Sequence, residues 1–319
     1  MNSVLFLYRG ENFDADFYYF SGVDIDHAFF VQKGEERFLL VPKMNEALAR
    51  KSFSGKVIAC TDFVGELKKI VRGKMLVNSH SISASLYQKL SKYFRLEDAS
   101  AMIYEKRMKK KNHELACVSK AARITKEIFN SIDFSRCKTE LEVKKYLLRE
   151  TLERGLEQAF EPIVATDKNS SYPHYKSGDV KLGSIVLIDY GVRYKKYCSD
   201  LTRCFFLKND NLAKEAKMNY DKLLLIFDEI MDNFPDFENG GDVAKFTKKL
   251  FVKYKLPSMI HSIGHGVGLD VHELPRLGEK SKDKLKNTIL AIEPAVYFKG
   301  YGIRFEETVY FDGKRARVL

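Results

Sequence analysis

The segment Ser184-Ile-Val-Leu-Ile-Asp189-Tyr-Gly191, followed by Tyr197-Cys-Ser-Asp200-Leu-Thr-Arg203, is the most informative stretch of this chain. Asp189 lies within an otherwise apolar strand, where an unpaired carboxylate would be costly. If the chain turns at Tyr194-Lys195, an in-register antiparallel hairpin places Asp189 directly opposite Asp200. Side chains of directly opposed residues lie on one face about 5 Å apart. Two carboxylates this close repel each other unless a cation lies between them, so the hairpin predicts a metal site.

The same arrangement occurs again near the end of the chain. Glu293 lies in Leu290-Ala-Ile-Glu-Pro-Ala-Val296, and Glu306 lies in Ile303-Arg-Phe-Glu-Glu-Thr-Val309. A turn at Lys299-Gly300 sets Glu293 opposite Glu306 on one face of a second hairpin. Two hairpins that each present a facing pair of acids are improbable as a structural accident, which strengthens the prediction of a metal site.

A histidine between the two hairpins completes the predicted ligand set. His265 is bracketed by glycines in Gly264-His-Gly-Val-Gly268, which let the backbone approach a crowded centre. Four carboxylates and one imidazole suit two divalent ions about 3.5–4 Å apart. The five cysteines are an odd number without CxxC spacing, so we interpret them as reduced thiols and expect only oxygen and imidazole ligands.

Composition bounds the class of protein and its partners. The 319 residues are 45% hydrophobic and 30% charged, which is typical of a globular protein with about two domains. The apolar run Val4–Leu7 is too short for a signal peptide, and nothing reaches the roughly 18 apolar residues of a membrane span, so we expect a cytoplasmic protein without membrane contact. The net charge of +11 would also suit nucleic acid, but the chain has no aromatic-rich nucleic-acid motif, so we interpret it as a solvated lysine-rich surface.

The chain changes character at the basic run 106–111. Short strands and helices alternate before it, which predicts a small α/β domain over residues 1–108. Longer helices and strands follow, which predicts an α+β domain over residues 109–319. A capping box of Thr139 and Glu142 predicts a helix that runs to Glu153 and ends at Gly155. Further helices are expected at 114–132, 212–233 and 242–254, and strands at 159–165, 184–191, 197–207, 289–298 and 303–311.

The acid and histidine motifs together resemble those of the metallopeptidase family M24, whose catalytic domain has the "pita-bread" (creatinase/aminopeptidase-like) fold. The resemblance covers about 112–311, and residues 1–108 are more weakly similar to the creatinase/prolidase N-terminal domain. It implies that Asp189 binds one divalent ion, that His265 and Glu293 bind the other, and that Asp200 and Glu306 bridge them. Mn fits best, with Co, Fe or Zn as alternatives. The motifs are Asp189-x10-Asp200-Leu-Thr-Arg203, Gly264-His265-Gly-Val-Gly, Val271-His272-Glu-Leu-Pro, Ile292-Glu293-Pro294 and Arg304-Phe-Glu306.

Within the family, the chain looks most similar to the proline-specific branch. His174 matches a Pro-His pair before the first metal aspartate, and Arg276 follows His272 in the Val-His-Glu-x-Pro-Arg pattern of prolidases. The resemblance implies hydrolysis of the Xaa-Pro bond of dipeptides by a metal-bridging hydroxide, with proline-containing dipeptides or short peptides as substrates. Relatives are frequently homodimers, which the resemblance extends to this chain.

The same resemblance suggests a role for each further residue. Glu293 would take a proton during attack, and His174 and His272 would donate hydrogen bonds to the substrate carbonyl or to the oxyanion. Arg276 is a candidate clamp for the substrate carboxylate, and Arg304 is a candidate for substrate binding or for orienting the neighbouring carboxylates. His261 is interpreted as structural or as a support for the ligands.

Other functions remain open at this point. An Xaa-Pro aminopeptidase acting on longer peptides is the first alternative, and a methionine aminopeptidase is more distant. A creatinase-type hydrolase would work without metals, but such proteins have lost the ligands that this chain retains. A non-catalytic binding protein of the same fold, engaging RNA through its basic surface, is the last alternative.

Overall fold

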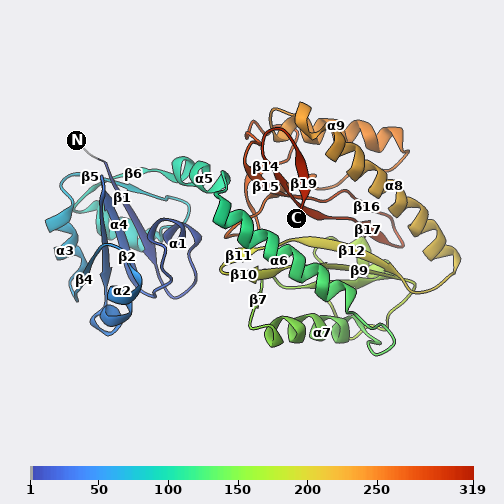
Figure 1. Ribbon diagram of the computed structural model, residues 1–319, viewed down its shortest axis with the longest axis horizontal. Coiled ribbons are helices and arrows are strands. Elements are labelled where there is room, and N and C mark those ends of the chain that lie inside the picture. Colours follow the sequence, from blue (N-terminus) through green and yellow to red (C-terminus); the bar gives the residue numbers. More distant parts are fainter. Residues whose placement is uncertain (1–2) are drawn as a thin grey trace. The chain divides into compact units, whose positions relative to one another are not determined.

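The computed structural model describes residues 3–319, and the chain divides into two compact units, Met1–Arg107 and Met108–Leu319. We describe each unit by itself (Figure 1). Among the described residues, no helix is long and apolar enough to cross a membrane.

The first unit is a six-stranded mixed sheet with the order β4-β3-β2-β1-β5-β6. Buried apolar clusters lie around this sheet, and the predicted alternation of short strands and helices in this region is confirmed. The sequence did not reveal β5, β6, α1 and α5; the two strands have four residues each and carry charged side chains. The strands are β1 Val4–Arg9, β2 Ala28–Lys33, β3 Glu36–Val41, β4 Lys56–Ala59, β5 Lys74–Val77 and β6 Arg95–Asp98, and the helices are α1 Ala15–Ser21, α2 Glu46–Ser52, α3 Phe63–Ile70, α4 Ala84–Ser91 and α5 Ser100–Met108.

The second unit contains four long helices close to the predicted positions, namely α6 Asn112–Asn130, α7 Glu140–Glu153, α8 Asn211–Asn233 and α9 Gly240–Lys253. The capping box before α7 is confirmed. The Thr139 side chain accepts from the Glu142 backbone N–H, and the Glu142 carboxylate accepts from the Thr139 backbone N–H. Gly155 follows the helix at φ 67°, a left-handed conformation that glycine adopts without steric cost.

Two sheets of the second unit carry the acids singled out in the sequence. One has the order β12-β9-β8 and the other the order β14-β13-β15-β18-β19. Helices α6 and α7 pack against the first, and α8 and α9 pack against the second (Figure 1). Their strands are β8 Ile163–Thr166, β9 Ile185–Tyr190, β12 Leu201–Phe206, β13 Gly264–Gly266, β14 Glu273–Arg276, β15 Thr288–Ile292, β18 Glu307–Phe311 and β19 Ala316–Val318.

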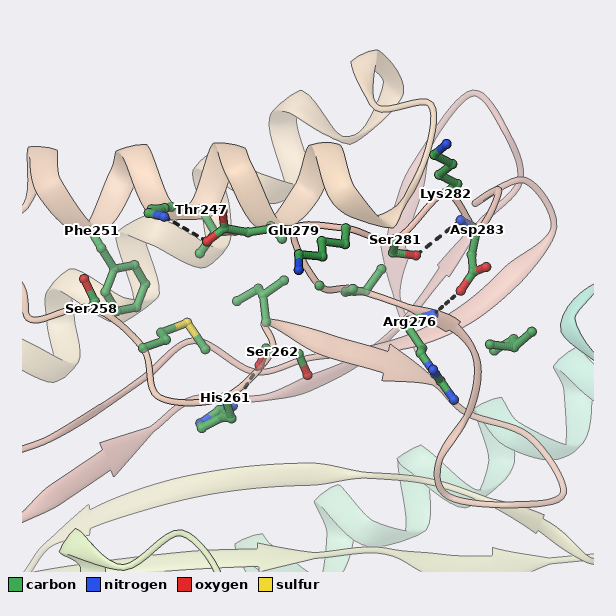
Figure 2. A pocket seen from close by; sticks show the side chains of 18 residues that line it. Thr247, Phe251, Ser258, His261, Ser262, Arg276, Glu279, Ser281, Lys282 and Asp283 are labelled. Carbon is green, nitrogen blue, oxygen red and sulfur yellow. Dashed lines mark hydrogen bonds and ion pairs between the residues drawn. The ribbon is translucent and has the colours of Figure 1, made fainter. Parts of the chain in front are cut away.

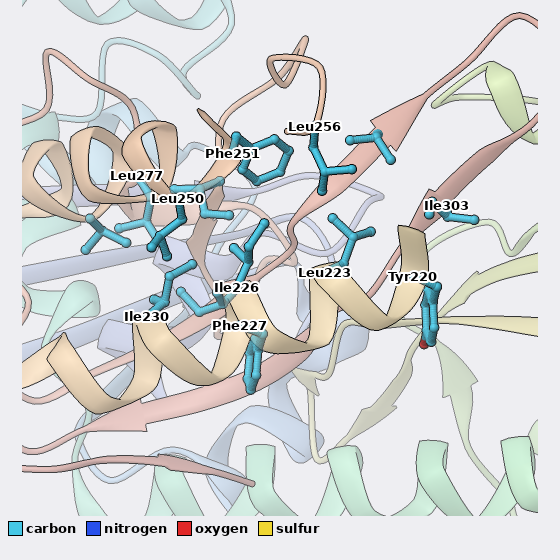
Figure 3. Packing of buried hydrophobic residues seen from close by; sticks show 14 of the residues in the cluster. Tyr220, Leu223, Ile226, Phe227, Ile230, Leu250, Phe251, Leu256, Leu277 and Ile303 are labelled. Carbon is cyan, nitrogen blue, oxygen red and sulfur yellow. The ribbon is translucent and has the colours of Figure 1, made fainter. Parts of the chain in front are cut away.

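The interior between α8, α9 and the second sheet is filled by large apolar side chains. Figure 3 shows Leu223, Ile226 and Ile230 of α8 directed toward Leu250 and Phe251 of α9. A fully buried aliphatic side chain contributes about 1.5–3 kcal/mol of transfer free energy, so this cluster fixes the sheet that carries His265 and Glu293.

The predicted register of the first hairpin is wrong by two residues. Asp189 pairs with Thr202 rather than Asp200, because the chain turns at Lys195-Lys196 instead of Tyr194-Lys195. Both lysines have positive φ, 47° and 72°, as a two-residue type I′ turn requires. A shift of two residues leaves each side chain on its original face, since the period of a strand is two. Asp189 and Asp200 therefore still face the same side.

The predicted register of the second hairpin is confirmed. Ile292 pairs with Glu307 and Ala295 with Arg304, which places Glu293 opposite Glu306 in the same register. The strands are not continuous as predicted, because each breaks at these acids, leaving a short pair of β16 Ala295–Tyr297 and β17 Gly302–Arg304 beyond them. Glu293 and Glu306 therefore lie outside the regular strands, in the short segments between β15 and β16 and between β17 and β18.

Candidate metal centre

The five residues expected to bind metal lie together in the second unit. Ligand atoms of Asp189, Asp200 and Glu306 are within 4.8 Å of one another, and so are those of His265, Glu293 and Glu306. Glu306 belongs to both groups and is only 2% exposed, as a residue that bridges two ions would be. Asp200, 4% exposed, also forms a group with His265 and His272. The two hairpins and the glycine-bracketed strand β13 thus bring their side chains together at one point.

Without a cation, the carboxyl groups at this point favour their protonated forms. Burial, followed by the charges of Glu306 and Asp189, raises the pKa of Asp200 well above its usual value. Burial raises the pKa of Glu306 in the same way, with Asp189 and Glu293 adding to the effect. Burial is also the main reason why the pKa of Glu293 rises to about 7, against the opposing effect of Arg304. Positive charge at this point would relieve the repulsion among these acids.

His265 is held as a neutral imidazole with one nitrogen directed at the acids. Its Nε2 lies 3.5 Å from Asp200 Oδ2 and 3.8 Å from Glu293 Oε1. Its Nδ1 lies 3.1 Å from the Gly266 carbonyl oxygen, to which Nδ1–H donates in the tautomer that leaves Nε2 free to bind a metal. Burial and the neighbouring His272 lower the pKa of His265 to about 4.

The donor set fits divalent cations. Oδ1 of Asp189 is buried and has no hydrogen-bond partner among residues 3–319, an arrangement that is costly unless a further group binds it. Carboxylate oxygens and imidazole nitrogens suit Mn, Co, Fe and Zn. Close backbone approach maintains the cluster, since a Cβ at Gly264 would lie 1.9 Å from the Ala291 carbonyl oxygen.

Arg304 orients two of the acids, Asp189 directly and Glu306 through Thr202. Its Nη2 lies 2.5 Å from Asp189 Oδ2, and its Nε donates to Thr202 Oγ1 at 2.9 Å. Thr202 Oγ1 in turn donates to Glu306 Oε2 at 2.7 Å. Arg304 is 3% exposed, and its three nitrogens all contact protein oxygens, the third being Tyr297 Oη at 2.9 Å. These contacts favour a role of Arg304 in orienting the neighbouring carboxylates. They disfavour the alternative role in substrate binding, because the guanidinium is already surrounded by Asp189, Thr202 and Tyr297.

Two residues at the centre were missed or undervalued in the sequence. Tyr297, in β16, accepts from Arg304, and its hydroxyl lies 3.0 Å from His261 Nε2. His261 Nδ1 lies 3.8 Å from Glu293 Oε2, and burial lowers the pKa of His261 to about 4. Nothing in the local sequence marks Tyr297. The signal for His261 was its position near His265 in sequence, which gains meaning only from the contacts of its ring in the folded chain.

The residues expected to contact substrate lie at the exposed side of this centre. The rings of His272 and His265 have centroids 4.3 Å apart. His174 is exposed, and its charge adds to the effect of burial, which is the main cause of the lowered pKa of both His261 and His272. Arg276, exposed at the end of β14, pairs directly with His265 across the strands. The structure thus brings every predicted site residue of the second unit to one region.

A cavity of 1100 Å³ adjoins the centre between α9 and β14. His261 and Arg276 belong to its lining and connect it to the acids, while Phe251, Met259 and Leu277 form part of its apolar wall. Figure 2 shows His261 and Arg276 on the side of this cavity opposite α9. Typical sites for small ligands measure about 300–1,000 Å³, so the volume of this cavity slightly exceeds that range.

Comparison with known proteins identifies the family. The model of metallopeptidase family M24 matches residues 116–312. The chain belongs to metallopeptidase family M24. An uncharacterized peptidase of Methanocaldococcus jannaschii is 33% identical over 221 residues, which cover 65% of this chain and 62% of that protein, so the match spans less than two thirds of that relative. An Xaa-Pro dipeptidase of Pyrococcus furiosus is 26% identical over 320 residues, which cover 95% of this chain and 90% of that protein.

Solved structures share the fold over nearly the whole chain. The X-Pro aminopeptidase of Thermotoga maritima matches with a TM-score of 0.89 at 24% identity, over 99% of this chain and 95% of that one. The prolidase of Pyrococcus furiosus matches with a TM-score of 0.86 at 23% identity, over 99% and 95%. The predicted fold class, an N-terminal α/β domain followed by a pita-bread domain, is confirmed by these likenesses.

Proposed function

We propose that this protein is a dinuclear metallopeptidase that hydrolyses the Xaa-Pro bond of dipeptides. The observation that carries this proposal is the pair of overlapping ligand groups that share Glu306, found in a chain of family M24. The name of the Pyrococcus furiosus relative, an Xaa-Pro dipeptidase, supports proline-containing substrates.

Asp189, Asp200, His265, Glu293 and Glu306 would hold two divalent ions, with Asp200 and Glu306 shared between them. Mn is the metal we favour, with Co, Fe or Zn as alternatives, since all four accept carboxylate and imidazole ligands. Bound divalent ions supply activation of water at neutral pH and polarisation of the substrate carbonyl.

The protein's own groups would bind the substrate and move the proton. Glu293, with a pKa of about 7 in the metal-free protein, is suited to accept a proton near neutral pH. His272 and His174 would donate hydrogen bonds to the scissile carbonyl as negative charge develops on it. Arg276 belongs to the lining of the cavity and would bind the terminal carboxylate of a dipeptide through two hydrogen bonds.

A second candidate is an Xaa-Pro aminopeptidase that acts on longer peptides. The cavity of 1100 Å³ favours it, because that volume exceeds what a dipeptide fills and the lining includes side chains of α9 as well as Arg276. In this case the chain of the substrate would continue into the cavity past the proline residue.

The two candidates are separated by hydrolysis assays with metal-stripped protein, with and without added Mn²⁺, on Met-Pro, Met-Ala and a longer Met-Pro peptide. Metal-dependent cleavage restricted to Met-Pro supports the dipeptidase. Cleavage of the longer peptide supports the aminopeptidase, and no cleavage of any substrate contradicts both and favours a binding role. We also propose a cytoplasmic homodimer, with residues 1–108 as a creatinase/prolidase-type domain and 109–319 as the catalytic domain.

A further inference from the structure

The basic run 106–111 contains one lysine that is not a surface residue. The side chain of Lys110 is 1% exposed. Its Nζ donates to Glu273 Oε1 at 2.5 Å and to the Met108 carbonyl oxygen at 3.2 Å. Its backbone N–H donates to the Asn287 carbonyl oxygen at 2.7 Å, directly before β15. Lys110 is therefore fixed at both its backbone and its ammonium group, within the second unit.

Glu273, the acid of this pair, is the residue that follows His272. Its side chain is 8% exposed, and its backbone pairs with Gly266, next to His265. The carboxylate lies against Gly268, because a Cβ at that glycine would be 2.3 Å from Glu273 Oε1. The Glu273 carboxylate is thus close to both the Lys110 ammonium group and the backbone of Gly268.

His272 depends on its backbone for its orientation. Among residues 3–319, its ring nitrogens have no hydrogen-bond partner, and its ring packs against that of His265. A side chain without its own hydrogen bonds is positioned by the segment that carries it. That segment begins β14 at Glu273, so the ion pair with Lys110 holds the residue directly after His272, whose ring lies near Asp200 and His265.

The free energy of the buried Lys110–Glu273 pair also favours a positioning role over a stabilising one. Burying two charges carries a desolvation cost that the attraction between them often only offsets, so a buried ion pair is weak evidence of a contribution to stability. An apolar pair of similar volume would fill the same space. The geometry of the pair, 163 residues apart in sequence and adjacent to His272, suits positioning better than stability.

We propose that Lys110 is a positioning residue, whose buried ion pair with Glu273 holds His272 beside the acids of the metal centre. This inference rests on the proposed function, in which His272 donates a hydrogen bond to the reacting carbonyl. Because that bond strengthens as charge develops in the transition state, losing it lowers kcat and kcat/KM together and leaves KM nearly unchanged.

The test is a double-mutant cycle on Met-Pro and a longer Met-Pro peptide with Mn²⁺-loaded full-length protein. Lys110→Met is expected to lower kcat about 10- to 100-fold at nearly constant KM. It should have no further effect in the His272→Ala background, because both substitutions remove the same contribution, the hydrogen bond from His272 to the reacting carbonyl. If Lys110→Met lowers kcat as much in the His272→Ala background as in the parent, the positioning role is wrong.

Stability is measured in parallel to separate positioning from folding. Lys110→Met removes the ammonium group that pairs with the buried Glu273 carboxylate, so the double variant Lys110→Met/Glu273→Leu is expected to recover thermal stability while kcat stays low. Recovery of kcat together with stability would assign the pair a purely structural role. The double variant also serves as the cycle background if Lys110→Met alone does not fold.

A matched control is Asp16→Asn in the first unit, which breaks the buried ion pair between Arg107 and Asp16, whose side chains are 6% and 5% exposed. It should lower stability without changing kcat. A wild-type protein that hydrolyses neither peptide would overturn the proposed function and this role with it, whereas an active wild type with an additive cycle overturns the role of Lys110 alone.

Discussion

Arg304 and Asp189 form a buried ion pair of 2.5 Å across two hairpins that are 115 residues apart in sequence. The arginine is the one cation enclosed with the acid cluster in the described part of the chain, and it occupies a single oxygen of Asp189 while the other oxygen has no partner. The pair therefore fixes the Asp189 carboxylate through Oδ2 and leaves Oδ1 available to a cation.

Loss of this pair is expected to affect the metal-free protein most. Arg304→Met leaves Asp189 buried without its counter-charge, and breaking a buried pair in this way typically costs about 3–5 kcal/mol. Bound metal supplies part of the missing positive charge, so the loss measured by urea denaturation should shrink when Mn²⁺ is added. Arg149→Met, at an arginine that is 62% exposed, is the control and should change neither value by more than about 0.5 kcal/mol. An equal loss with and without metal would contradict this account.

Asp200 is expected to be required for occupancy of both sites. Asp200→Asn removes one negative charge and leaves a weaker ligand at a position proposed to be shared by both ions. We expect metal content and peptidase activity to be lost together, as measured by elemental mass spectrometry after gel filtration and by hydrolysis of Met-Pro. Full activity of this variant would exclude the dinuclear arrangement.

Two adjacent glutamates provide an internal test of the ligand assignment. Glu306→Gln should lose metal, whereas Glu307→Gln should retain it, because Glu307 forms ion pairs with Arg203 and with Lys126 at 2.9 Å instead of facing the cluster. Glu307→Gln should nevertheless unfold at a lower temperature, since it weakens both pairs. The reverse pattern of metal content would show that Glu307 is the ligand.

Metal affinity is expected to increase with pH. Burial raises the pKa of Glu293 to about 7 and raises the pKa values of Asp200 and Glu306, so the metal-free protein holds protons that a cation must displace. His265, with a pKa of about 4, is already neutral and adds nothing between pH 5 and 7. Calorimetric titration with Mn²⁺ in two buffers of different ionisation enthalpy should show proton release at pH 6. Affinity independent of pH from 5 to 8 would contradict these protonation states.

The same shift has a consequence for the stability of the metal-free protein. The folded state binds the Glu293 proton more tightly than the unfolded chain, whose carboxyl has its ordinary pKa of 4.5. The resulting stabilisation is fully present below pH 4.5 and is lost as the pH rises through about 7. Thermal unfolding of the metal-free parent should therefore lose stability relative to Glu293→Gln over this interval, and a constant difference between the two would refute the shift.

Arg276 is expected to affect substrate binding rather than the metals. If its guanidinium binds the carboxylate of a dipeptide, Arg276→Gln should raise KM for Met-Pro roughly 10- to 100-fold, since hydrogen bonds to charged groups contribute about 1.5–3 kcal/mol. Metal content should be unchanged. Met-Pro amide, which lacks the carboxylate, is the control substrate and should show no dependence on Arg276. A similar rise in KM for the amide would mean that Arg276 acts in another way.

Several features could be predicted because they depend on local sequence. The capping box of Thr139 and Glu142 predicts α7, since it satisfies backbone donors at the start of a helix wherever that helix packs. The second hairpin has Gly300 at its turn and apolar residues on both sides of Glu293, so its register was readable. The first hairpin turns at Lys195-Lys196, two residues that rarely adopt positive φ, and its register was therefore misplaced by two residues.

The sequence by itself determined the set of acids and the histidine proposed to bind metal, because alternation along a strand and the spacing of a hairpin constrain which side chains share a face. Only the tertiary structure decided which residues surround that set. Tyr297 reaches His261 and Arg304, and Lys110 reaches Glu273, through contacts that no local pattern encodes. Such contacts join elements far apart in the chain, and their partners become neighbours only when the sheets and helices pack together.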